Sequence, residues 1–155
     1  KTAFFRAMLA GWAGDAKAEP VPGESGFKRT LCQVGDFFVI DKYGKGRGSN
    51  AAVGMTTIWY FDEPVWSMSY EGHYRKDEIP FLKSLLVEAY ENGVFCGGRG
   101  RPIAMSDDTL LLYSNDQRTG STFSRFAGRE QIIVCANGDQ LGQHGYRGGS
   151  LLSRS

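Results

Sequence analysis

The chain has 155 residues, 18 of them basic and 17 acidic, and a formal net charge of +1 at pH 7; 41% of the residues are hydrophobic. These values are typical of an ordinary globular protein, and residues 1–155 are expected to form a single domain. The balanced charge argues against direct binding to nucleic acid or to a membrane surface. No apolar run approaches the roughly 18 to 20 residues of a membrane span.

Glycine is the compositional outlier, at 21 of 155 residues. This is about twice the usual share and predicts turns, bulges and curved sheets. The three cysteines, Cys32, Cys96 and Cys135, form no C-x-x-C pair. We therefore expect no disulfide framework and no zinc site, but buried, unreactive thiols in a reducing, cytoplasmic compartment. The chain begins at Lys1 and not at a methionine, which leaves open whether another domain precedes it.

The first half of the chain predicts one helix and four strands. Residues 2–12 place apolar side chains on one helical face: Phe5, Met8, Leu9 and Trp12. A loop rich in proline and glycine covers residues 14–26. Strands are expected at residues 28–34, 36–41, 54–61 and 65–74, with hairpin turns at Gly35-Asp36 and at residues 62–64. In the fourth strand Trp66, Met68 and Tyr70 alternate with polar residues, which predicts one buried face.

A second helix is expected over residues 79–92, because an acidic turn and Pro80 precede an apolar stripe and Asn92-Gly93 follows it. The stripe consists of Leu82, Leu85, Leu86 and Ala89. After a loop at residues 96–102, four strands are expected at residues 109–115, 121–127, 131–136 and 141–146, with one turn at Gly128-Arg129. The pattern predicts an α+β fold: a strongly twisted antiparallel sheet of about eight strands with two main helices.

Two glycine-rich basic loops are candidates for phosphate binding. No helix follows residues 43–50, so this loop does not fit a phosphate-binding motif, and a hairpin connection is favoured. In the loop at residues 97–102, Arg99 and Arg101 are weak candidates for binding a carboxylate or phosphate. An exposed surface loop is the favoured interpretation there.

The two histidines, His73 and His144, would need a carboxylate such as Asp41 or Glu71 to form a metal site, and their spacing does not indicate one. A nucleophilic pair of Cys96 or Cys135 with either histidine is equally unsupported by spacing. We expect neither a metal ion nor a cofactor.

Aromatic residues cluster on the two strands between residues 54 and 74. Ordinary core packing is one interpretation. The other is a ligand pocket, because tyrosine and tryptophan combine an apolar body with a polar tip. The predicted ligand-binding residues are Asp41, Tyr43, Trp66, Tyr70 and Tyr113.

Three segments together resemble a bacterial family of unknown function, DUF5680: Asp41-x-Tyr43-Gly44, Val53-Gly54 and residues 64–72. The likeness continues more weakly to Gly148-Gly149. Val53 and Thr56 stand where the family has phenylalanine and an acidic residue, so a role tied to that carboxylate does not carry over. Family members occur alone or behind a helix-turn-helix domain. The resemblance therefore implies a sensory module linked to transcriptional regulation, although this chain contains no helix-turn-helix of its own.

Three classes of function remain open. The leading expectation is a small-molecule-binding or sensory module without catalytic activity. The first alternative is a small enzyme whose acid or base is Asp41, Glu71, His73 or His144. The second is a protein-interaction module that uses the glycine-rich loops. The sequence leaves the ligand and the oligomeric state open.

Overall fold

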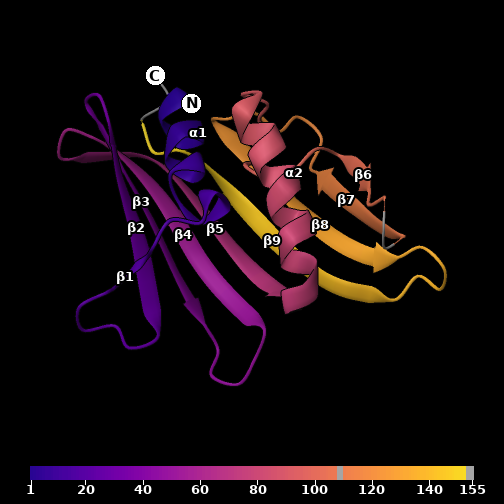
Figure 1. Ribbon diagram of the computed structural model, residues 1–155. Helices are drawn as coiled ribbons and strands as arrows, with labels where there is room; N and C mark the ends of the chain where they lie inside the picture. Colours follow the sequence, from indigo (N-terminus) through magenta and orange to yellow (C-terminus); the bar gives the residue numbers. More distant parts are fainter. Residues whose placement is uncertain (108–109, 153–155) are drawn as a thin grey trace.

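The chain forms an antiparallel sheet with two α-helices across one of its faces, as the computed structural model shows for residues 1–107 and 110–152 (Figure 1). We call the face that carries the helices the inner face, and the opposite one the outer face. This architecture confirms the α+β class. Within the described residues the sheet has nine strands, close to the expected eight.

The first part of the chain, in order, comprises α1 (Thr2–Leu9), η1 (Trp12–Gly14), β1 (Glu19–Pro20), β2 (Phe27–Val34), β3 (Phe37–Lys45), β4 (Ala51–Tyr60) and β5 (Glu63–Tyr74). The second part comprises η2 (Lys76–Glu78), α2 (Ile79–Glu91), β6 (Ile103–Met105), β7 (Leu111–Gln117), β8 (Arg125–Val134) and β9 (Gln140–Ser150). The strands lie in the order β1-β2-β3-β4-β5-β9-β8-β7-β6. Two meanders therefore meet where β5 pairs with β9 in the middle of the sheet.

Helix α2 agrees with the sequence prediction. Pro80 lies in its first turn, where a missing backbone N–H costs no hydrogen bond. The helix ends before Gly93, whose φ of 64° is the left-handed conformation that glycine adopts without strain. The predicted apolar stripe is buried: Leu82, Leu85, Leu86 and Ala89. None of the described helices is long and apolar enough to span a membrane.

The prediction of two strands at residues 121–127 and 131–136 is wrong, because the single strand β8 runs through Gly128-Arg129. Gly128 makes no turn. A Cβ atom there would overlap the ring of Tyr146 on β9, so the glycine lets this ring lie against the sheet. The short strand β1 lies in the segment 14–26 that was expected to be a loop, and β6 lies between the expected loop at residues 96–102 and the next expected strand. The strand predicted from Thr109 begins at Leu111, and Thr109 lies outside the described residues.

The prediction of an exposed surface loop is wrong for residues 96–100, because all five residues are buried. Gly97 and Gly98 have φ values of 66° and 73°, and side chains there would overlap the rings of Tyr146 and Phe4. The loop thus packs closely on the inner face of the sheet. The expectation of buried thiols is wrong for Cys135, which is exposed.

Candidate functional site

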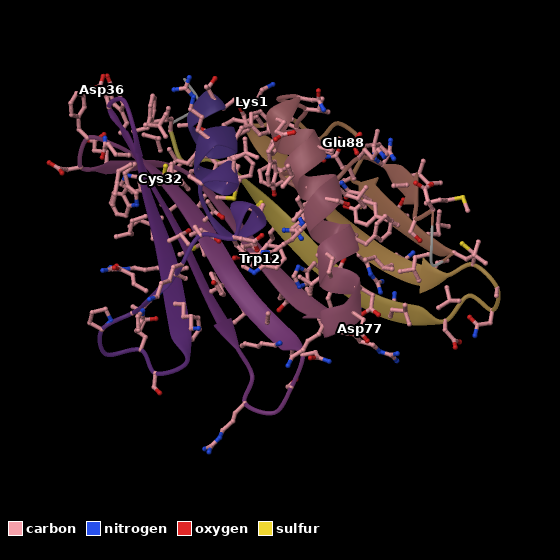
Figure 2. All side chains as sticks on the ribbon, viewed as in Figure 1. Lys1, Trp12, Cys32, Asp36, Asp77 and Glu88 are labelled. Atoms are coloured by element: carbon pink, nitrogen blue, oxygen red, sulfur yellow. The ribbon has the colours of Figure 1, made fainter. Side chains whose placement is uncertain are left out.

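A cavity of about 260 Å³ lies between the inner face of the sheet and the helices. Its apolar walls are Met8, Trp12, Ala13, Ala52, Met68, Ile79, Leu82 and Leu86. Polar side chains also line it: Asp41, Tyr43, Lys45, Asn50, Thr56, Tyr70, Tyr74, Tyr90, Arg99 and His144. Figure 2 shows Trp12 beyond the end of α1, on the side toward α2. An apolar space with a few convergent polar groups is typical of small-molecule sites.

The register of the central strands brings the polar residues together. Asp41 on β3 pairs with Thr56 on β4. Two residues further along β3, Tyr43 pairs with Gly54, which pairs in turn with Tyr70 on β5. Because residues directly opposite each other share one face of a sheet, all these side chains belong to the inner face.

Asp41 is the buried carboxyl group of the cavity, with a relative exposure of 6%. Its Oδ1 atom accepts hydrogen bonds from Thr56 Oγ1 at 2.8 Å and from the Tyr70 hydroxyl at 3.0 Å. Burial raises the pKa of Asp41, although these two hydrogen bonds and the charge of Arg99 act to lower it. Both of these hydrogen bonds go to Oδ1.

The tyrosines beside Asp41 remain neutral hydrogen-bond donors. Burial, with the charge of Asp41 as the next cause, raises the pKa of Tyr43 and also that of Tyr70. The effect is large at Tyr70, whose pKa lies well above the ordinary value. The charge of Asp41 therefore reaches two phenol groups of the same cavity.

Arg99 is held by a buried network behind the cavity. Its Nε donates to Glu130 Oε1 at 2.8 Å, and its Nη2 donates to the same oxygen. The Tyr113 hydroxyl donates to Glu130 Oε2 at 2.6 Å and accepts from the Gly100 amide at 3.0 Å. Burial is the largest single effect and acts to lower the pKa of Arg99, but the charge of Glu130, the hydrogen bond to it and the nearby tyrosines together hold the pKa well above the ordinary value. Arg99 and Glu130 thus form a buried ion pair.

His144 lies directly opposite Glu130, on the neighbouring strand β9. Burial lowers the pKa of His144 to about 4; Arg99 adds to the effect and Glu130 opposes it. Nδ1 is 3.8 Å from Glu130 Oε1, and this buried nitrogen makes no hydrogen bond within the described chain. The ring of Tyr74 meets the imidazole edge-on, with 4.8 Å between ring centroids. The imidazole is therefore neutral at pH 7.

The structure brings together some of the residues predicted from the sequence and separates others. Asp41, Tyr43 and Tyr70 line the cavity with Arg99. Trp66 lies outside the lining and packs in the core, where its ring stacks on Phe123 at 4.8 Å between centroids.

Two further candidates also lie apart from the cavity. Tyr113 is fully buried behind it and binds Glu130. Arg101 is exposed and lies 3.5 Å from Glu88, a surface pair of little energetic weight. Glu88 is labelled on the outward side of α2 in Figure 2.

Glu71 and His73, two of the proposed acids or bases, point away from the cavity. They alternate along β5 with Tyr70 and Tyr74 and line a separate hollow on the outer face, beside Val53. They cannot act together with Asp41 on one substrate.

Sequence reasoning missed Trp12, Thr56 and Glu130 as site residues. A signal for Glu130 is present, because Phe126, Gly128, Glu130 and Ile132 follow the alternation of a strand with one buried face. The turn predicted at Gly128 divided this strand into two, so the alternation was not recognised. No cluster of three or more metal-ligating side chains occurs in the part of the chain that the structure describes.

The comparisons with known proteins identify a family. No curated protein and no solved structure matches the chain. A family model described as a domain of unknown function, DUF5680, matches residues 41–151. The matched span contains Asp41, Tyr70, Arg99, Glu130 and His144, which are among the polar groups of the cavity and of the network behind it. The matched residues make up more than half of the chain, and the chain therefore belongs to the DUF5680 family.

Proposed function

We propose that this chain is a small-molecule-binding domain, and that its ligand occupies the cavity between the sheet and the helices. The observation that carries the proposal is the convergence of Asp41, Tyr70 and Arg99 on an apolar cavity of about 260 Å³. This volume is slightly below the roughly 300 to 1,000 Å³ of sites for drug-sized molecules, so it suits a small metabolite.

Sensing without catalysis is the role we favour for the domain. Family members that stand behind a helix-turn-helix domain support a link to transcriptional regulation in the bacterial cytoplasm. Occupancy of the cavity offers a physical signal, because the ligand would contact α1 and α2 as well as the sheet. A ligand that binds one arrangement of these helices better than another shifts the population between them.

The test is identification of the bound molecule by native mass spectrometry after gentle purification. The variant A52F fills the cavity, whereas V53F adds the same side chain to the next residue of β4, on the outer face. We expect the wild type and V53F to carry the same metabolite and A52F to carry none, while all three unfold cooperatively. A wild type that releases no metabolite, and that no member of a metabolite collection stabilises against heat, would contradict the proposal.

Catalysis is a second candidate, favoured by one observation: the cavity contains a buried carboxyl group with a raised pKa. A buried carboxyl group with a raised pKa can act as a general acid or base. Incubation of the purified protein with the identified metabolite separates the two candidates. Conversion to a product that the D41N variant no longer forms would support catalysis, whereas an unchanged metabolite supports sensing.

A further inference from the structure

The cavity contains a buried carboxylate that no cation of the described chain neutralises. Both hydrogen-bond partners of Asp41, Thr56 and Tyr70, are uncharged. Of the two basic residues in the lining, Arg99 is paired with Glu130, and Lys45 is exposed at the end of β3. Neither forms an ion pair with Asp41. An isolated ionised carboxylate is costly to bury, so a positive charge from a ligand would be strongly favoured beside it.

The balance of charge around the cavity also favours a cation. Among the buried groups, Asp41 and Glu130 supply two negative charges and Arg99 supplies one positive charge, whereas the charge of Lys45 lies at the exposed end of β3. His144 is neutral at pH 7. A ligand with an anionic group would bring a third negative charge to a guanidinium that Glu130 already holds through two nitrogens. A ligand with a cationic group would bring the buried part of the site to neutrality.

Aromatic rings accompany the carboxylate. Tyr43 and Tyr70 flank Asp41 closely enough for its charge to raise the pKa of both, and Tyr74 and Trp12 line the same cavity. The face of an aromatic ring attracts an ammonium group, and this attraction is strongest where water is excluded. A carboxylate among aromatic rings is a suitable site for an organic cation.

We propose that the ligand is an organic cation, with a protonated amine or a quaternary ammonium group bound by Asp41 beside Tyr43 and Tyr70. Its apolar body contacts Met68 and Leu86, on opposite walls of the cavity. This inference rests on the proposed small-molecule-binding function and names the class of ligand.

The experiment compares three probes of similar shape and different charge: 2-phenylethylamine, 2-phenylethanol and 3-phenylpropionate. Their affinities are measured by ligand-observed NMR for the wild type, D41N and E71Q. D41N removes the charge in the cavity and keeps an oxygen acceptor for Thr56 and Tyr70. E71Q is the matched control, because Glu71 is a carboxylate on the outer face of β5, two strands away from Asp41.

We expect the wild type to bind the amine about tenfold or more tightly than the alcohol, as charge-assisted contacts are the strong ones. E71Q should keep this preference and D41N should lose it. The thermal unfolding midpoint of D41N should equal or exceed that of the wild type, because the substitution removes a buried charge.

Several results would overturn the inference. Tight binding of the alcohol or the carboxylate that A52F abolishes would reject the cation and leave the small-molecule function intact. A co-purified metabolite without a cationic group would do the same. If D41N still prefers the amine to the alcohol, the cationic group does not bind to Asp41. If none of the three probes binds, the inference fails; if, in addition, no metabolite co-purifies and no member of a metabolite collection stabilises the wild type, the proposed function fails with it.

Discussion

The ring of Tyr70 occupies the space that a side chain at Gly54 would need. These two residues lie directly opposite each other on β5 and β4, and a Cβ atom at position 54 would overlap the ring and its hydroxyl. The absence of a side chain therefore lets Tyr70 lie flat against the sheet and reach Asp41 on β3, one strand further on. The same relationship recurs between Tyr74 and Gly142.

Replacement of Gly54 by alanine should displace Tyr70 and disturb its hydrogen bond to Asp41. The steric conflict lies in a packed region, so G54A should reduce the free energy of unfolding by about 1 to 3 kcal/mol in urea titrations. G145A is the matched control, because Gly145 lies within β9 and a Cβ atom there meets nothing within 4 Å. G145A should change the free energy of unfolding by no more than about 0.5 kcal/mol. Equal stability of the two variants would show that the ring moves aside freely.

Local patterns in the sequence were sufficient to predict α2 and the buried face of β5. The leucine stripe fixes the helix face, and Asn92-Gly93 marks the helix end. The alternation of Trp66 and Met68 with serines identifies the inner face of β5. These features depend on neighbours in the chain, which is why the sequence alone reveals them.

The role of several glycines depended on residues distant in sequence. Gly54 and Gly128 carry no turn, and each accommodates a ring from another strand. Their role depends on strand register, which composition does not reveal. The pairing of Arg99 with Glu130 joins a loop to a strand 31 residues away. Sequence reasoning therefore found Asp41, Tyr43 and Tyr70 but missed Glu130.

Helix α2 should depend on Leu85, which is 4% exposed. Truncation in L85A removes buried methyl groups and leaves a cavity, so the free energy of unfolding should fall by about 2 to 5 kcal/mol. S84A, at an exposed position of the same helix, is the control and should change it by less than about 0.5 kcal/mol. Urea unfolding followed by circular dichroism measures both. A small effect of L85A would mean that the helix contributes little to the packed core.

The ion pair of Arg99 and Glu130 should show strong coupling in a double-mutant cycle. Either R99M or E130L alone leaves a buried charge without its partner and should cost about 3 to 5 kcal/mol of unfolding free energy. The double variant removes both charges and should cost much less than the sum of the two. The cycle is measured by urea unfolding at pH 7. Additive losses would show that the two side chains contribute independently of each other.

Acid should destabilise the protein through His144. Its pKa in the folded chain is about 4, below the ordinary value of 6.5, so between these values the unfolded chain binds more protons than the folded one. Stability contributed by neutral His144 is complete above about pH 6.5 and is lost as pH falls toward 4, by about 3 kcal/mol in all.

The contribution of His144 can be isolated by comparing the pH dependence of unfolding in the wild type and in H144Q. Asp41 acts in the opposite direction, because its raised pKa makes the folded chain the stronger proton binder. Both proteins retain Asp41, so the difference between their unfolding free energies reports on residue 144. This difference should shrink between pH 7 and pH 4. NMR titration of the imidazole checks the cause directly, and a folded-state pKa near 6.5 would show that His144 takes up its proton without cost.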